Sequence, residues 1–200
     1  MSAASAFSVA PLWYTTRSTA VIGFVLLTFS MMLGLASTQR ALTGPSWPHF
    51  ATQTLHRNIS LLALLFVVAH IVTTVADSFV KVGWWAVVVP GVSHYKTAWI
   101  TLGTIAFDVM LVVIATSLLR DLLPLWVWRG IHFSVYGLWA LAFVHFLAIG
   151  SDAAHGHWGL WLDIGAAVLI VLVLIARRGR PNRPVPGGYD RPDAPQLGHP

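Results

Sequence analysis

Four histidines lie in or directly beside two long apolar segments of the chain, at a spacing that suits metal chemistry. His56 and His70 are 14 residues apart in one segment, and His132 and His145 are 13 apart in the other. An α-helix rises about 1.5 Å per residue, so each pair spans roughly 20 Å along its helix. If the two helices run in the same direction, the four imidazoles meet as two facing couples at two depths. Two imidazoles facing one iron atom are the axial ligands of a b-type haem, so the spacing predicts two such haems.

The expected rotation of the helices agrees less well with this arrangement. At about 100° per residue, a step of 14 returns to within roughly 40° of the starting face, whereas a step of 13 misses it by roughly 140°. An ideal straight helix would therefore point His132 and His145 to different sides. Either Gly137 permits a distortion, or the two haems sit on different flanks of this helix. A single histidine in a membrane often only hydrogen-bonds to a neighbouring helix, but four at matched depth favour haem.

The elements that position these histidines are membrane helices. Of the 200 residues, 56% are hydrophobic and 10% are charged, and the mean hydropathy is +0.73. A soluble domain of this length carries more charge. A helix needs about 20 residues to cross the hydrocarbon, and it satisfies every backbone polar group internally. We expect an all-α membrane protein whose five transmembrane helices form a haem-binding bundle, at residues 18–39, 58–76, 97–119, 130–151 and 153–176.

The other segments are expected to lie outside the hydrocarbon. We divide the chain into an N-terminal segment at 1–17, a transmembrane haem-binding domain at 18–177 and a basic tail at 178–200. The tail is rich in Pro and Gly, which predicts disorder. Residues 78–95 are too broken to span, and their paired tryptophans suit a membrane interface, so we expect a cap on the outer surface.

The basic residues predict the orientation. With the N-terminus outside, nine Lys and Arg residues, including a cluster at 177–191, lie inside, and three lie outside. Cytoplasmic loops carry such an excess, so we expect an N-out, C-in protein, placed in the bacterial inner membrane. The same residues account for the pI near 10.2. We therefore expect these basic residues to interact with the lipid bilayer and expect no binding of nucleic acid.

The chain has no cysteine, which excludes disulfides, iron–sulfur clusters and covalent c-type haem attachment.

Several charged residues have alternative roles. Arg57 either neutralises a haem propionate or is an ordinary residue of the cytoplasmic side. Arg17 and Lys96 either face outer propionates or an anionic acceptor, or they anchor the chain at the interface. Asp108 lies mid-span, where it either takes up protons or hydrogen-bonds to Thr104 or to a neighbouring helix.

The paired spacing, His-x13-His on one helix and His-x12-His two helices later, resembles the ferric reductase-like transmembrane domain family. That family includes ferric reductases, NADPH oxidases and the haem-binding membrane subunit of the bacterial methionine sulfoxide reductase system. The runs HRNIS at 56–60, TSLLR at 116–120 and WRGIH at 128–132 resemble parts of its haem helices. The resemblance covers residues 17–178.

The resemblance implies that His56 and His132 ligate an inner haem and that His70 and His145 ligate an outer one. It also implies that electrons move from the cytoplasmic side to an acceptor outside. Family members usually carry flavin and nicotinamide domains after the last helix, whereas a short tail follows here and no Gly-rich dinucleotide fingerprint occurs. We therefore expect a separate reductase or quinol as the electron donor, and a chain that is the membrane component of an oxidoreductase.

The sequence is also compatible with two other functions. One is a quinol-oxidising haem-binding subunit that passes electrons to a separate extracytoplasmic oxidoreductase. The other is a non-redox transporter or assembly protein whose histidines bind each other or a metal ion. A purified protein without haem colour would favour the last, whereas reduction by quinol or a co-purifying soluble partner would favour the quinol-oxidising subunit.

Overall fold

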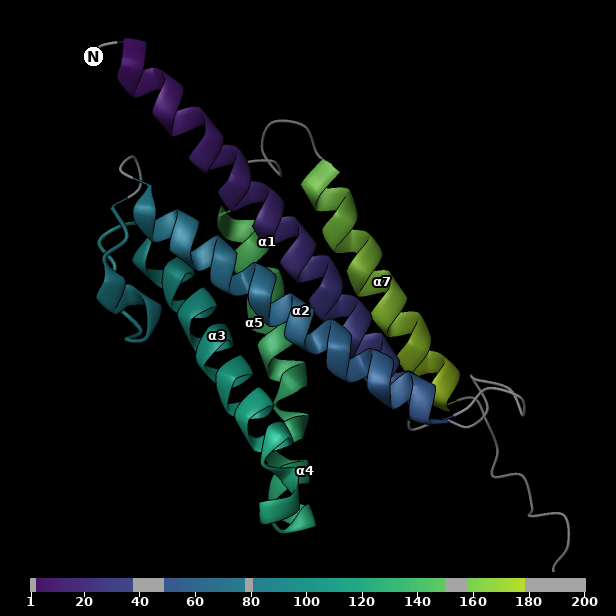
Figure 1. Ribbon diagram of the computed structural model, residues 1–200. Helices are drawn as coiled ribbons and strands as arrows, with labels where there is room; N and C mark the ends of the chain where they lie inside the picture. The colour runs from purple at the N-terminus through teal and green to yellow at the C-terminus, as the bar shows by residue number, and fades with distance from the viewer. Residues whose placement is uncertain (1–2, 38–48, 78–80, 150–157, 179–200) are drawn as a thin grey trace, which may run out of the picture.

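The computed structural model describes residues 3–37, 49–77, 81–149 and 158–178 (Figure 1). Within these ranges the chain is helical and has no strand, which confirms the expected all-α class. Most of the predicted tail lies outside them. The α-helices are α1 (Ala3–Ser37), α2 (His49–Ala76), α3 (Thr97–Leu118), α4 (Leu125–Phe133), α5 (Val135–Ile149) and α7 (Trp158–Arg178), and the short 3-10 helices are η1 (Trp84–Val87) and η2 (Arg120–Leu122).

Four of the described segments are long and apolar enough to cross a membrane: Pro11–Ala36, Phe50–Ala76, Thr97–Leu118 and Leu125–Ile149. They correspond to the first four predicted spans and fit an integral membrane protein. Where the fifth span is expected, the chain forms α7, whose crossing of the bilayer stays a prediction. α1 is continuous from Ala3, so residues 3–17, which were expected to precede the first span, are part of the same helix.

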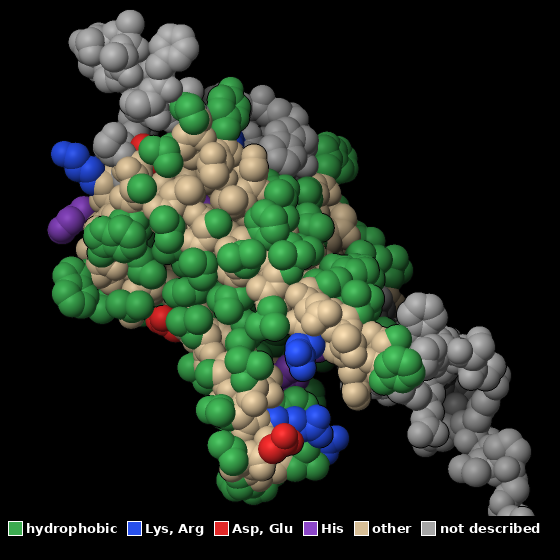
Figure 2. Space-filling model, in the orientation of Figure 1, with side chains coloured by type: hydrophobic (Ala, Val, Ile, Leu, Met, Phe, Trp, Pro, Cys, Tyr) green, Lys and Arg blue, Asp and Glu red, His purple; other side chains and the backbone are tan. Residues whose placement is uncertain are grey.

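The outer surface of the helices is mostly apolar. Phe50 is 72% exposed and Leu65 is 62% exposed, and Figure 2 shows hydrophobic side chains over most of one face. Contiguous apolar surface of this kind is unfavourable in water and favourable in lipid. Several hydroxyl groups on the spans bond to a carbonyl of their own helix; Thr116 Oγ1, for example, donates to the Val112 carbonyl at 2.7 Å.

The spans pack as two hairpins, α1 with α2 and α3 with α5 (Figure 1). Gly23 lets α1 approach α2 closely, because a Cβ built there would lie 3.3 Å from Val67 Cγ2. α7 packs against α1 through the buried side chain of Ile170. Trp139 Nε1 of α5 donates to Thr28 Oγ1 of α1 at 3.0 Å. This bond connects the two hairpins.

The fourth span is interrupted at Ser134, between α4 and α5. The Ser134 amide donates to the Ile131 carbonyl at 3.0 Å, and its hydroxyl donates to the same oxygen at 2.6 Å. An amide bonded three residues back tightens the last turn of a helix into 3-10 geometry. α4 and α5 therefore do not share one rotational register. A distortion at Gly137 was one of two explanations for the 13-residue step, and the interruption lies at Ser134 instead.

Residues 81–96 form the cap, a compact segment that contains η1 and covers the start of α3. Trp84 and Trp85 are 64% and 76% exposed, whereas Ala86 is buried. Thr104 Oγ1 of α3 donates to the Ala86 carbonyl at 2.6 Å and holds the cap in place. The described part of the expected cap thus folds without spanning, and its position at the outer surface stays a prediction.

Candidate haem-binding site

His56 and His132 meet at the end of the bundle far from the cap. Their ring centroids are 6.2 Å apart, and the ring planes are inclined by 72°. With a metal–nitrogen bond of about 2 Å on each side, and each nitrogen about 1 Å from its ring centre, two imidazoles across one metal have centroids roughly 6 Å apart. The separation of the two rings therefore matches that of a ligand pair.

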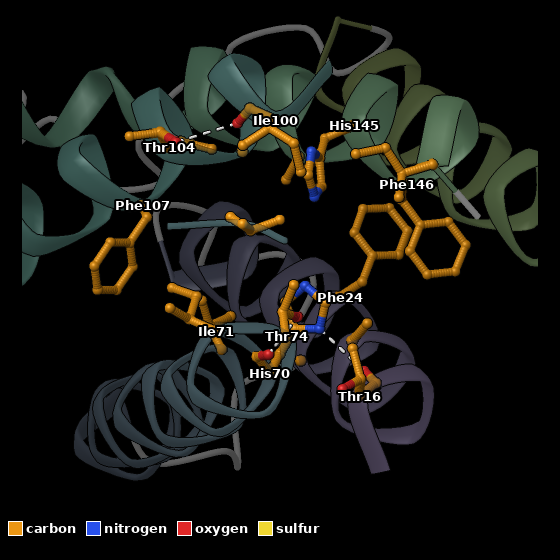
Figure 3. Close-up of a pocket in the computed structure, with 18 of the residues that line it drawn as sticks. Thr16, Phe24, His70, Ile71, Thr74, Ile100, Thr104, Phe107, His145 and Phe146 are labelled. Atoms are coloured by element: carbon orange, nitrogen blue, oxygen red, sulfur yellow. Dashed lines mark hydrogen bonds between the residues drawn. The ribbon is translucent and has the colours of Figure 1, made fainter. Parts of the chain in front are cut away.

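His70 and His145 line one cavity near the cap. Figure 3 shows the two imidazoles on opposite walls, each directed toward the other, with Phe24 and Phe146 along one side. The cavity measures about 450 Å³, within the range of roughly 300–1,000 Å³ that small-molecule and cofactor pockets occupy. Its lining is mostly apolar, with contributions that include Leu27, Val67, Ile71, Met110 and Leu138. This environment suits a large apolar group between the two histidines.

Three of the four imidazoles are held through Nδ1 by a backbone carbonyl. His56 Nδ1 lies 2.9 Å from the oxygen of Ser30, His70 Nδ1 lies 3.0 Å from that of Thr16, and His145 Nδ1 lies 2.7 Å from that of Trp99. A carbonyl oxygen only accepts, so each Nδ1 must carry the proton. The lone pair of a neutral ring is then on Nε2. Histidine ligands of metals have this arrangement, in which an outer hydrogen bond fixes the tautomer and the ring orientation.

Each of these carbonyls is followed four positions later on the same helix by a small residue, and at two of the three positions a glycine makes room for the ring. Gly103 lies directly beneath the His145 ring, because a Cβ built there would be 2.6 Å from His145 Cε1. Gly34 plays the same part for His56, with a corresponding distance of 3.3 Å. A larger side chain would push either ring away from its carbonyl. The carbonyl residue and the small residue are Ser30 and Gly34, Trp99 and Gly103, and Thr16 and Ala20.

His132 is held differently. The Trp128 ring stacks on it at 5.0 Å between centroids, with the planes inclined by 23°. Trp128 Nε1 donates to Ser117 Oγ at 3.4 Å, and this hydroxyl lies 3.5 Å from His132 Nδ1. Since a hydroxyl both donates and accepts, Ser117 imposes no tautomer on His132. The Arg120 guanidinium lies 4.8 Å from the Trp128 ring centre on the surface of the bundle.

The other predicted residues divide into two groups. Arg17 and Lys96 line the cavity of His70 and His145. Arg57 is exposed, and Asp108 is half-buried on α3. A propionate contact of Arg57 therefore stays a prediction. The Thr104 hydroxyl, expected as a partner of Asp108, donates instead to the cap.

The sequence analysis did not identify the residues that hold the imidazole rings in place. The carbonyls of Thr16, Ser30 and Trp99 carry no sequence signal, because every residue has one. Gly34 and Gly103 carry a weak signal, since glycine inside an apolar helix is as typical of ordinary helix packing. Within the described residues no group of three or more His, Cys, Asp or Glu converges on one point.

No known protein family, characterised protein or solved structure matches this chain. The resemblance to ferric reductase-like membrane domains therefore depends on the residues of this sequence alone. The geometry of the two histidine pairs is the independent support for any function.

Proposed function

We propose that this chain is a transmembrane electron carrier that holds two b-type haems, the membrane component of a ferric reductase-like system. His70 and His145 hold one haem near the cap, and His56 and His132 hold the other near the opposite end. The observation that carries the proposal is the opposition of His70 and His145 across an apolar cavity of about 450 Å³. Both rings are anchored through Nδ1 to carbonyls on neighbouring helices, which leaves Nε2 for iron.

The anchoring favours metal ligation over simple helix–helix hydrogen bonding. A histidine that only links two helices has no need of a second histidine facing it across a cavity. Here the carbonyl bond uses Nδ1, and the remaining nitrogen of each ring is on the side of the partner ring in Figure 3. If His70 and His145 both ligated the iron of a haem, the bound group would supply one-electron transfer and no coordination position for a substrate.

The chain's own residues then have two tasks. The histidines orient the two cofactors at different depths of the bundle, and the apolar walls exclude water from the path between them. The electron donor is a separate reductase or quinol, and the acceptor is an extracytoplasmic redox partner or ferric iron. The protein acts in the bacterial inner membrane, with the cap outside.

Absorption spectroscopy of the purified full chain tests the haem assignment. We expect a reduced spectrum after dithionite with the sharp α-band of low-spin b-type haem, and no such band for a His70→Ala/His132→Ala double variant. Conduction is tested in proteoliposomes that contain trapped ferricyanide and receive dithionite outside. Loss of ferricyanide absorbance that requires the wild-type protein supports electron transfer across the bilayer, and equal loss in protein-free vesicles would contradict it.

A further inference from the structure

The two imidazoles of the pair far from the cap are crossed. The ring planes of His56 and His132 are inclined by 72°, at 6.2 Å between centroids. His56 belongs to α2 and His132 belongs to α4, so neither helix fixes both rings. The angle between the two planes therefore depends on two separate sets of contacts, one around each ring.

The His56 ring is fixed by Ser30 and Ser60. Its Nδ1 lies 2.9 Å from the Ser30 carbonyl oxygen and 3.2 Å from Ser30 Oγ. Ser30 Oγ lies 2.6 Å from Ser60 Oγ, which donates to the His56 carbonyl at 2.7 Å. Because the Ser60 proton is used at that carbonyl, the Ser30 hydroxyl donates to Ser60 and accepts from His56. The plane of His56 is thus held at one nitrogen by two acceptors of the same residue.

The plane of His132 is set by an aromatic ring. Trp128 precedes it by four residues on α4, and side chains at this spacing share one face of a helix. The indole and the imidazole lie 5.0 Å apart between centroids, with planes only 23° from parallel. An imidazole that turned about its Cβ–Cγ bond would lose this stacked contact. The orientation of the indole therefore determines that of the His132 ring.

The indole of Trp128 is itself held by the end of α3 and the start of η2. Its Nε1 donates to Ser117 Oγ of α3 at 3.4 Å. The Arg120 guanidinium of η2 lies 4.8 Å from the ring centre, where a cation is attracted to the π electrons of the indole. Contacts at both its edge and its face thus connect the indole to the element that precedes α4.

We propose that Trp128 is the positioning residue that keeps His132 crosswise to His56, with Ser117 and Arg120 holding the indole. This inference rests on the proposed function, in which the two imidazoles ligate one haem iron. Groups around a metal ligand orient it and so tune the metal. Crossed imidazoles donate π electrons to two different d orbitals of low-spin ferric iron, whereas parallel ones donate to the same orbital. The angle between the planes therefore determines the largest g-value in electron paramagnetic resonance.

Nuclear magnetic resonance of the haem-free full chain in nanodiscs tests the stack without the cofactor. Histidine is labelled with carbon-13, and the His132 signal is assigned by its absence in His132→Gln. The variants are Trp128→Leu, Trp128→Phe and, as the matched control, Trp126→Leu, since Trp126 is an exposed tryptophan of the same helix. We expect the ring current of the indole to shift the His132 ring protons upfield. Trp128→Leu should lose this shift, while Trp128→Phe and the control retain an upfield shift. An unchanged His132 signal in Trp128→Leu would overturn the proposal.

Electron paramagnetic resonance of the same proteins loaded with haem and oxidised tests the positioning role. We expect the largest g-value of one haem to fall in Trp128→Leu at unchanged haem content, and to match the wild type in Trp128→Phe and Trp126→Leu. Haem loss from Trp128→Leu that Trp128→Phe restores would also support the stack. Spectra of Trp128→Leu equal to the wild type, or haem loss from both Trp128 variants, would overturn it. A wild type without haem would overturn the proposed function, while the haem-free measurement still decides whether Trp128 orients His132.

Discussion

The His145 ring lies directly on Gly103 of α3, so closely that a Cβ on Gly103 would be 2.6 Å from His145 Cε1. Real Cβ atoms do not approach a ring carbon to this distance, and this ring is held by its own hydrogen bond to the Trp99 carbonyl. The identity of residue 103 and the position of the imidazole are therefore coupled. Any side chain at this position must displace the ring or push α3 away from α5.

Gly103→Ala should disconnect His145 from the iron that it is proposed to ligate. We expect the low-spin ferric signal of one haem to convert to a high-spin signal, or that haem to be lost, while the other is unchanged. Electron paramagnetic resonance of the oxidised protein measures the spin state. Gly137→Ala is the matched control, because a Cβ at Gly137 of α5 meets nothing within 4 Å. An unchanged spectrum of Gly103→Ala would show that His145 is not an axial ligand.

The bond between Trp139 and Thr28 should stabilise the contact of the two hairpins. Thr28→Val removes the acceptor, while the indole N–H stays in an apolar environment, so we expect a loss of about 1 kcal/mol in the free energy of unfolding. Denaturant titration in detergent micelles measures it. Thr116→Val is the control, because that hydroxyl donates to its own helix. Equal effects of the two substitutions would show that the interhelical bond contributes nothing.

The orientation of the protein in the membrane can be measured by labelling introduced cysteines, because the chain has none of its own. Single cysteines placed at Lys81, Arg129 and Asn182 report which side of the membrane each position faces. A membrane-impermeant maleimide added to intact spheroplasts should label Lys81→Cys and should label the other two only after permeabilisation. Labelling of Asn182→Cys but not of Arg129→Cys in intact spheroplasts would mean that α7 does not cross the bilayer. Labelling of Arg129→Cys in intact cells would reverse the proposed orientation.

The first four spans and the two levels of histidines could be predicted from the sequence because both depend on distance along the chain. Lipid requires apolar runs of a certain length, and a regular rise per residue converts the spacing of His56 and His70 into depth. These properties are local to one helix. They do not depend on which other helices pack against it.

The groups that hold the histidine rings and the interruption between α4 and α5 could not be predicted. The first depend on which helices are neighbours, and the second depends on the backbone conformation of a single turn. Serine is a common residue in membrane helices, so nothing marks Ser134 as the site of the 3-10 turn, and the sequence pointed to Gly137 instead. The carbonyls that hold the imidazoles are backbone groups without a sequence signature. Gly103 becomes informative only once the ring of His145 is placed on it.

The number of haems bound per chain in histidine variants tests most directly whether the four histidines form two pairs of haem ligands. Pyridine haemochrome assays, with protein quantified by amino-acid analysis, give this ratio for the full chain and for His56→Ala, His70→Ala, His132→Ala and His145→Ala. His94→Ala, on the exposed surface of the cap, is the matched control. We predict two haems for the wild type and the control, and one for each of the four variants. Full haem retention in all four, or a wild-type protein without haem, would contradict the assignment of these imidazoles to iron.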